Sequence, residues 1–252
     1  MQVNLTNKVV LVTGASRGIG KAIAEVLGEA GASVAVHCNS NLELAQKLAT
    51  VIGHNSKAFQ ADLGDAKAAE ELLNAVLSHY GHLDILINNA GIAIASDMKM
   101  NGEQWLQDWS KTMAVNLTAP ALLCRLAIPH FIERKEGIII NISSRAAFRG
   151  DTADYLGYAA SKGGLVALTK SIARAYGKQG ITAFGVAPGF TKTEMAQDFI
   201  DAYGEDYAIK DIALTELTEP LDVAHTVCFL ASGLAKHATG ATIDINAGSY
   251  VR

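Results

Sequence analysis

The stretch VVLVTGASRGIG at residues 9–20 decides the fold of this chain. Its first residues are apolar and mostly branched, which is typical of a strand that is buried on both faces. The glycines that follow, spaced Gly-x-x-x-Gly-x-Gly, permit a tight turn and a close approach of backbone amides to a diphosphate. A helix is predicted to begin near Lys21, and its amino terminus adds positive potential there. A plain tight turn can also use such glycines, but this position after a first strand favours dinucleotide binding.

Short apolar runs of the same kind recur along the 252 residues, and alanine- and leucine-rich segments with helical spacing separate them. This alternation predicts a doubly wound α/β fold with a parallel sheet of about seven strands. No linker or repeat interrupts the pattern, so residues 1–252 are predicted to form a single domain. The runs after the first are SVAVHC at 33–38, SKAFQAD at 56–62, DILINNAG at 84–91, GIIINISS at 137–144, ITAFGVAPG at 181–189 and ATIDINAG at 241–248.

The composition indicates a globular protein and argues against several function classes. Half of the residues are hydrophobic and 18% are charged, with a net charge of −4 and a pI near 6.0. This balance argues against nucleic acid or an anionic membrane as the main partner. No apolar run reaches the ~18 residues that a membrane span needs, and the amino terminus lacks the pattern of a signal peptide.

The cysteines and histidines predict neither a disulfide framework nor a metal site. Cys38, Cys124 and Cys228 are far apart in apolar surroundings, and we expect them to be reduced core residues of a cytoplasmic protein. The seven histidines show no spacing that is typical of metal ligands.

Tyr158 and Lys162 are the candidate acid–base pair. In a helix, residues four positions apart share a face, so the phenol and the ammonium can converge. A nearby cation favours the phenolate, and we therefore expect Lys162 to lower the pKa of Tyr158 from its ordinary value near ~10. A tyrosine tuned in this way can act as an acid–base catalyst. The same spacing occurs in many helices without a catalytic role, so the catalytic interpretation of this pair depends on the accompanying motifs.

The end of the second predicted strand bears on the choice of cofactor. A carboxylate there would bind the adenosine 2′-hydroxyl of NAD and repel a 2′-phosphate. The strand instead ends His37-Cys38-Asn39-Ser40, without an acid. Arg17 in the glycine turn is suited to hold a phosphate, although a solvated loop arginine is the plain alternative. Together these features favour NADP(H).

Three further motifs lie where predicted strands end, which is the edge at which open α/β sheets bind their ligands. NNAG closes the fourth strand at 88–91, Ser144 follows the fifth, and Pro188-Gly189 follow the sixth. Each of them alone would be an ordinary turn or strand cap. Beside Tyr158, Ser144 becomes a candidate donor to a substrate carbonyl.

Taken together, these motifs resemble the short-chain dehydrogenase/reductase family nearly from end to end. The resemblance implies a Rossmann-type doubly wound sheet with the strand order 3-2-1-4-5-6-7. It also implies an oxidoreductase that interconverts a ketone and a secondary alcohol. The matching segments, in order, are TGASRGIG at 13–20, NNAG at 88–91, Asn116 in VNLTAP, Ser144 in NISS, YAASK at 158–162 and PG at 188–189.

The resemblance implies a role for each catalytic residue. Tyr158 donates a proton to the substrate carbonyl oxygen, Ser144 hydrogen-bonds the same oxygen, and Lys162 lowers the tyrosine pKa and binds the nicotinamide ribose. Asn116 completes a proton path through a helix irregularity and a water molecule. The residues implied to bind the cofactor are Gly14, Ser16, Arg17, Gly18, Ile19, Gly20, Asn39, Ser40, Asp62, Leu63, Asn89, Ala90, Gly91, Tyr158, Lys162, Pro188, Gly189 and Thr191.

Within the family, the general pattern is closest to 3-oxoacyl-(acyl-carrier-protein) reductases, through the length, the glycine turn and the ending DINAGSYVR. The departures are a longer stretch from Gly91 to Asn116, one extra residue from Ser144 to Tyr158, and a weaker basic site for the acidic carrier protein. Arg134-Lys135 supplies one basic position, and Lys178-Gln179 supplies the other only in part. An enzyme for sugars, steroids or small ketones stays open, as does a regulator that binds NADP(H) without turnover.

The resemblance also implies a homotetramer. Small residues in the helix after Tyr158 let another helix pack closely, and the apolar stretch 119–131 would supply part of a second interface. Residues 192–218 are expected to form a lid over the substrate. Its apolar members Met195, Phe199 and Ile212 are expected to set the preference for an acyl chain or a ring.

Overall fold

The computed structural model describes residues 3–194 and 209–252 of the chain, in which strands alternate with helices. The strands are β1 (Val9–Val12), β2 (Ser33–Cys38), β3 (Lys57–Gln60), β4 (Ile85–Asn88), β5 (Gly137–Ile142), β6 (Ile181–Pro188) and β7 (Thr242–Ile245). The α-helices are α1 (Gly18–Glu29), α2 (Leu42–Ile52), α3 (Ala66–Tyr80), α4 (Gly102–Met113), α5 (Ala119–Arg134), α6 (Ala146–Arg149), α7 (Leu156–Tyr176) and α10 (Pro220–Ala231). A π-helix, η1 (Ala114–Thr118), joins α4 to α5, and the 3-10 turns are η2 (Ala153–Tyr155), η3 (Gly177–Gln179) and η4 (Lys236–Ala238).

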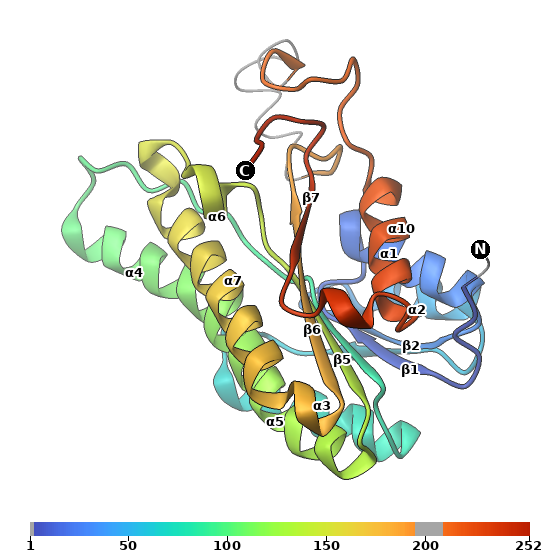
Figure 1. Cartoon of the computed structure of the whole chain (residues 1–252). Coiled ribbons are helices and arrows are strands. Elements are labelled where there is room, and N and C mark those ends of the chain that lie inside the picture. Colours follow the sequence, from blue (N-terminus) through green and yellow to red (C-terminus); the bar gives the residue numbers. More distant parts are fainter. Residues whose placement is uncertain (1–2, 195–208) are drawn as a thin grey trace.

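The strands form one parallel sheet in the order β3-β2-β1-β4-β5-β6-β7. Figure 1 shows α1, α2 and α10 on one side of this sheet and α3, α4, α5 and α7 on the other. The predicted doubly wound fold and its strand order are therefore confirmed.

Each face of the sheet has its own hydrophobic layer. Along β1, Val10 and Val12 belong to the layer with α1, α2 and α10, whereas Val9 and Leu11 belong to the layer with α3, α5 and α7. Successive side chains of a strand point to opposite faces. Because both faces are covered, the strand sequences read as continuous apolar runs.

The turns that follow β1, β4, β5 and β6 share one edge of the sheet. The register places Val12 beside Ile87, Asn88 beside Asn141, and Ile142 beside Val186. Because the strands are parallel, the chain leaves all four at the same edge. Figure 1 shows α6, which follows β5, at the same end of the molecule as the C-terminus.

A continuous helical stretch of 33 residues runs through α4, η1 and α5, from Gly102 to Arg134. Among the described residues it is the one helix long and apolar enough to cross a membrane, with a mean hydropathy of 1.3 in its apolar window. It contains no uninterrupted apolar run of ~18 residues, because Asn116, Arg125 and His130 interrupt it, so the expectation from the sequence stands. Length and composition are weak indicators, because core helices pass the same test, and 44% of the window is buried inside the protein.

The predicted lid at 192–218 is described only in part. Residues 195–208, which include Met195 and Phe199, lie outside the described residues. The two ends of the segment meet, because Lys192 N–H donates to Thr218 O (2.9 Å).

Candidate active site

The glycine turn after β1 adopts a conformation that glycine takes most easily. Gly14 and Gly18 have φ angles of 62° and 55°, in the left-handed region that side chains disfavour. A β-carbon on Gly20 would lie 2.2 Å from Gly14 O and 2.4 Å from Asn89 Nδ2. The turn is as tight as the glycine spacing predicts, and it leads directly into α1.

The amino terminus of α1 is suited to hold an anion. The first N–H groups of a helix have no acceptor within the helix. Within the described residues, the N-cap Arg17 makes no side-chain capping hydrogen bond to them. Together with the positive end of the helix dipole, the amides around Ser16 and Ile19 can bind a diphosphate.

Asn89 and Thr13 join the glycine turn to the turn after β4. Asn89 Nδ2 donates to Thr13 O (2.9 Å) and to Gly14 O (3.1 Å). Thr13 Oγ1 accepts from the backbone N–H groups of Asn89 (2.9 Å) and Ala90 (3.0 Å). Next in the chain, a β-carbon on Gly91 would lie 3.2 Å from Lys162 Nζ. The NNAG turn therefore fixes the glycine turn on one side and approaches Lys162 on the other.

Ser144, Tyr158 and Lys162 converge from the end of β5 and the first turns of α7. The Ser144 side chain is close enough to the Tyr158 phenol to lower its pKa, and Ser144 Oγ accepts from Ala146 N–H (3.1 Å). Lys162 Nζ donates to Ile142 O (2.9 Å) and lies 5.8 Å from the centre of the Tyr158 ring. Ser144 and Lys162 are buried, with 8% and 3% of their surfaces exposed, whereas Tyr158 is partly exposed.

The pKa of Tyr158 differs from the expectation drawn from the sequence. Burial raises the pKa of the phenol, the hydrogen bond with Ser144 opposes this rise, and the charge of Asp151 adds to it. Burial also lowers the pKa of Lys162 to about 8. The expected lowering of the Tyr158 pKa by Lys162 is therefore wrong for this arrangement, because burial has the largest influence on the phenol and raises its pKa. A phenol with a raised pKa is a weaker acid than an ordinary tyrosine, and it stays protonated at neutral pH.

Asn116 lies fully buried in the π-helix η1, the kind of irregularity that we expected at this position. Its Oδ1 accepts from Ile92 N–H (2.8 Å), and its Nδ2 donates to Ile92 O (2.8 Å) and Ser161 Oγ (3.1 Å). Ser161 Oγ donates onward to Tyr158 O (2.7 Å). Asn116 thus connects the turn after β4 to the first turn of α7, and its role in a proton path stays a prediction.

The residues after β6 lie at the same edge of the sheet, beside the end of β7. Gly189 N–H donates to Ile245 O (2.9 Å), and a β-carbon there would lie 2.8 Å from Asn246 Cα. Thr191 is buried, and its Oγ1 donates to Gly189 O (3.2 Å). Pro188 is the last residue of β6 and leads into this turn.

The residues predicted to surround the adenosine lie at the ends of β2 and β3. Asn39 and Ser40 are exposed after β2, while Asp62 is exposed and Leu63 is buried after β3. In the described residues, the exposed Arg17 guanidinium pairs with Glu194 and forms no ion pair at the end of β2.

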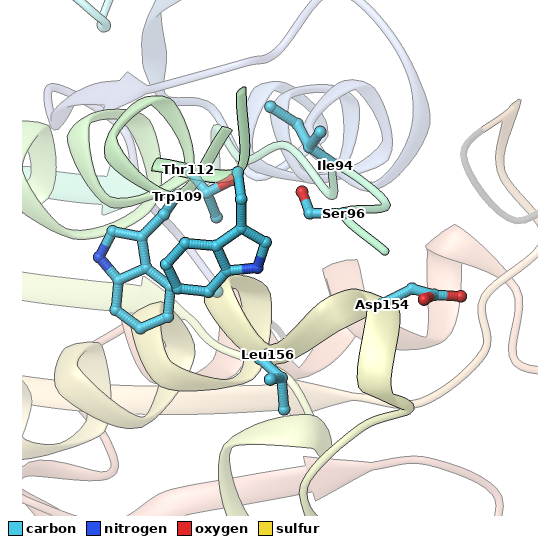
Figure 2. Close-up of a pocket in the computed structure, with 8 residues that line it drawn as sticks. Ile94, Ser96, Trp109, Thr112, Asp154 and Leu156 are labelled. Atoms are coloured by element: carbon cyan, nitrogen blue, oxygen red, sulfur yellow. The ribbon is translucent and has the colours of Figure 1, made fainter. Parts of the chain in front are cut away.

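A recess lies between α4, the loop after β4 and the start of α7. It is lined by Ile94, Ser96, Trp105, Trp109, Thr112, Asp154, Leu156 and Gly157. The two tryptophan rings stack, with centroids 5.2 Å apart and an angle of 24° between their planes, and Figure 2 shows Trp109 near Thr112 at the recess. A β-carbon on Gly157 would lie 3.4 Å from Trp109 Cε3. The recess therefore reaches the residue before Tyr158, although Tyr158 and Ser144 do not line it.

Sequence reasoning missed several residues that hold the site together. His37 binds the glycine turn, Thr13 binds the turn after β4, and Ser161 links Asn116 to α7. A histidine in an apolar strand carries no signal that separates it from a core residue, and the threonine and serine belong to motifs assigned to their neighbours. In residues 3–194 and 209–252, no group of three or more His, Cys, Asp or Glu side chains could hold a metal ion.

Comparisons with known proteins agree with this geometry. Residues 8–204 match the family described as short chain dehydrogenase. The 3-oxoacyl-(acyl-carrier-protein) reductase FabG of Vibrio cholerae is 37% identical over 248 residues, which are 98% of this chain and 99% of that protein. The reductase of the same name from Staphylococcus aureus is 38% identical over 247 residues, 97% of this chain and 98% of its own length.

Two solved structures share the fold over nearly the whole chain. A dehydrogenase/reductase from Sinorhizobium meliloti has a TM-score of 0.89 and 35% identity, covering 99% of this chain and 98% of its own. A structure described as ribose-5-phosphate isomerase from Brucella melitensis has a TM-score of 0.90 and 29% identity, covering 98% of this chain and 93% of its own. The two descriptions name different activities, so the fold by itself does not choose the reaction.

Proposed function

This chain belongs to the short-chain dehydrogenase family, and we propose that it reduces a 3-oxoacyl thioester with NADPH. Membership makes it an oxidoreductase that acts on a hydroxyl or carbonyl group. Two relatives whose names state the 3-oxoacyl reductase activity match nearly its full length, which favours this substrate over sugars, steroids and small ketones. The convergence of Ser144, Tyr158 and Lys162 at one sheet edge is the observation that supports carbonyl chemistry there.

The residues at this edge fit a dinucleotide. The glycine turn has no room for a β-carbon at Gly20, and the amides at the start of α1 face the position of a diphosphate. Pro188, Gly189 and Thr191 would hold the nicotinamide carboxamide, and Lys162 would hold its ribose. When bound, NADPH supplies the hydride that reduces the carbonyl carbon.

The preference for NADP(H) rests on charge at the adenosine end. Asn39 and Ser40 follow β2, and neither carries a carboxylate. Arg17 lies in the glycine turn, and its guanidinium is exposed. The ion pair of Arg17 with Glu194 is exposed on both sides, with 70% and 72% of the side chains accessible. Exposed pairs of this kind contribute little, so a 2′-phosphate can replace Glu194 as the partner of Arg17.

The protein supplies the proton and stabilises the developing negative charge. Tyr158 O–H donates its proton to the substrate carbonyl oxygen. Ser144 Oγ accepts from Ala146 N–H, so its own hydrogen is available for the same oxygen. Lys162 is positively charged below its pKa of about 8 and would bind the nicotinamide ribose.

We extend the same proposal to a homotetramer that takes its substrate from acyl carrier protein. Lys135 and Lys178 lie in adjoining turns, because Gly137 N–H donates to Gly180 O (3.3 Å) between them. Arg134 in the same region already pairs with Asp84 (3.0 Å). These turns precede β5 and β6, at the edge opposite to Ser144. A carrier protein bound at these turns would lie at the edge opposite to Ser144 of the same subunit, so the proposed homotetramer would have to bring the site of another subunit close to it.

The test is NADPH consumption with a short 3-oxoacyl thioester. We expect turnover by the wild type and a loss of about 10²-fold or more in Tyr158→Phe, because the phenolic proton is gone. Tyr176→Phe, at the far end of α7, is the matched control and should keep the wild-type rate. A wild type that binds NADPH without oxidising it would contradict the thioester substrate and direct the search to other ketones. Full activity in Tyr158→Phe would contradict the tyrosine mechanism.

A further inference from the structure

His37 is a buried residue of β2, with 1% of its surface exposed, and its ring connects two loops at the cofactor edge. Its Nδ1 lies 3.0 Å from the donating Gly14 N–H, and its Nε2 lies 3.1 Å from Ala61 O. A carbonyl oxygen only accepts hydrogen bonds, so Nε2 carries the ring proton and Nδ1 is a bare acceptor. The surroundings therefore fix one neutral tautomer of His37.

The main chain of His37 holds the same turn. Its carbonyl oxygen accepts from Ala15 N–H (2.8 Å), next to the bond from Gly14 N–H to the ring. Gly14 O, on the other side of the turn, accepts from Asn89 Nδ2 (3.1 Å). The first residues of the glycine turn are thus held from two directions, by His37 at their N–H groups and by Asn89 at the carbonyl oxygens.

We propose that His37 is a positioning residue that sets the geometry of the glycine turn and thereby the affinity for NADP(H). The inference rests on the proposed cofactor, and it adds a residue that binds neither cofactor nor substrate directly. Without the ring acceptor, Gly14 N–H loses its partner in a partly buried position, which is costly enough to favour another turn conformation. Because a diphosphate is held by backbone amides of this turn, a displaced turn binds it less well.

The proposed role differs from that of a side chain that only fills the core. A core filler affects the free energy of unfolding, but the folded fraction binds cofactor normally. A positioning residue changes cofactor affinity in the folded protein and leaves the chemical step at saturating cofactor intact. His37 does not touch Tyr158, Ser144 or Lys162 through any hydrogen bond of the described residues.

The experiment compares three variants of the full chain by fluorescence titration with NADPH and by turnover at saturating NADPH. His37→Leu keeps an apolar side chain of similar size without an acceptor, and His37→Asn keeps one acceptor and one donor. His130→Leu is the matched control, because His130 Nε2 accepts from Leu83 N–H (3.1 Å) at the opposite edge of the sheet. It removes the same kind of bond far from the glycine turn.

We expect His37→Leu to raise the dissociation constant of NADPH about tenfold, with kcat within about twofold of the wild type. His37→Asn should recover most of the affinity, and His130→Leu should bind NADPH like the wild type. Wild-type affinity in His37→Leu, or an equal loss in both leucine variants, would overturn the role. If His37→Leu does not fold, His37→Ala is titrated with NADPH in the presence and absence of imidazole. Imidazole should restore the affinity for NADPH, and a failure to do so would overturn the proposed role of His37.

Direct binding separates this role from the proposed function. A wrong substrate assignment leaves NADPH titrations unaffected, so the effect of His37 remains visible. A wild type that prefers NADH is titrated with NADH, because both cofactors carry the diphosphate. A wild type that binds neither dinucleotide would overturn the proposed cofactor and the role of His37 together.

Discussion

At the scale of single residues, Gly20 faces the strictest steric demand in the cofactor turn. The atoms that a β-carbon would meet are the backbone oxygen of Gly14 and the amide of Asn89, and both already hold the turn in place. The first is a backbone atom, and the second, although it ends a side chain, donates to Thr13 O and Gly14 O, so neither can move at little cost. Gly102, at the start of α4, has open space where its β-carbon would be.

Gly20→Ala is therefore expected to lower NADPH affinity by at least an order of magnitude, and to cost about 1–3 kcal/mol of stability through overpacking. Gly102→Ala, the matched control, should leave cofactor affinity unchanged. Fluorescence titration and urea unfolding measure the two effects. Cofactor affinity equal to the wild type in a folded Gly20→Ala protein would show that the turn has another way to relax.

At the scale of elements, the recess depends on α4 meeting the start of α7. Trp109 packs near Gly157, and Ser96 N–H donates to Asp154 O (2.8 Å), which ties the loop after β4 to the turn before α7. Two stacked indoles and Ile94 give the recess an apolar wall one residue from Tyr158. The recess has room for little more than a water molecule, so the acyl chain of the proposed thioester would contact the indoles at its rim and not enter it.

Trp109→Ala should then discriminate between substrates by chain length. A buried methylene contributes about 0.8 kcal/mol. If two methylenes of an eight-carbon 3-oxoacyl thioester lose their contact with Trp109, kcat/KM for this substrate should fall about tenfold. The four-carbon thioester should lose less than about threefold. Leu106→Ala serves as the control, since Leu106 is 58% exposed on the same helix and does not line the recess. Equal losses for both chain lengths would rule out this use of the recess.

At the scale of the whole molecule, stability in acid depends on keeping His37 neutral. Burial lowers the pKa of His37 to about 4, while the hydrogen bond to Ala61 O opposes this change. In the unfolded chain an ordinary histidine binds its proton near pH ~6.5. Between these values the unfolded state binds more protons, so the free energy of unfolding falls as the pH falls through this window.

Between pH 7 and pH 5, the free energy of unfolding of the wild type should therefore fall by roughly 2 kcal/mol more than that of His37→Asn. Urea unfolding of both proteins at the two pH values isolates this group, because the other titrating groups are shared. A difference between the proteins that does not change with pH would mean that His37 has the same pKa in the folded and unfolded states.

Much of the fold could be predicted from the sequence because buried parallel strands leave a strong local signal. Continuous apolar runs mark each strand, and glycine spacing marks the first turn. The site residues at strand ends followed from the same topology, since Ser144 and the NNAG turn had to emerge at one edge. Their catalytic and cofactor roles remain predictions.

What the sequence could not supply depends on surroundings. The spacing of Tyr158 and Lys162 places both on one face of α7, but it says nothing of the water that burial removes, and the direction of the tyrosine pKa was therefore wrong. His37 looks like any apolar-strand residue until its two partners are seen. The recess combines residues 94–96 with residues 154–157, which no local pattern connects.

The π-helix at Ala114–Thr118 changes how the side chains before and after it are rotated around the axis of the long helix from Gly102 to Arg134. A regular α-helix advances by about 100° per residue, so the wider π turn sets the rotation between the tryptophan half and the half that packs on the sheet. Deleting one residue from this turn would restore an even winding and turn one half relative to the other by about that angle. The aromatic wall would then face away from Gly157 while the sheet contacts stayed in place. One irregular turn therefore sets the direction in which Trp105 and Trp109 face.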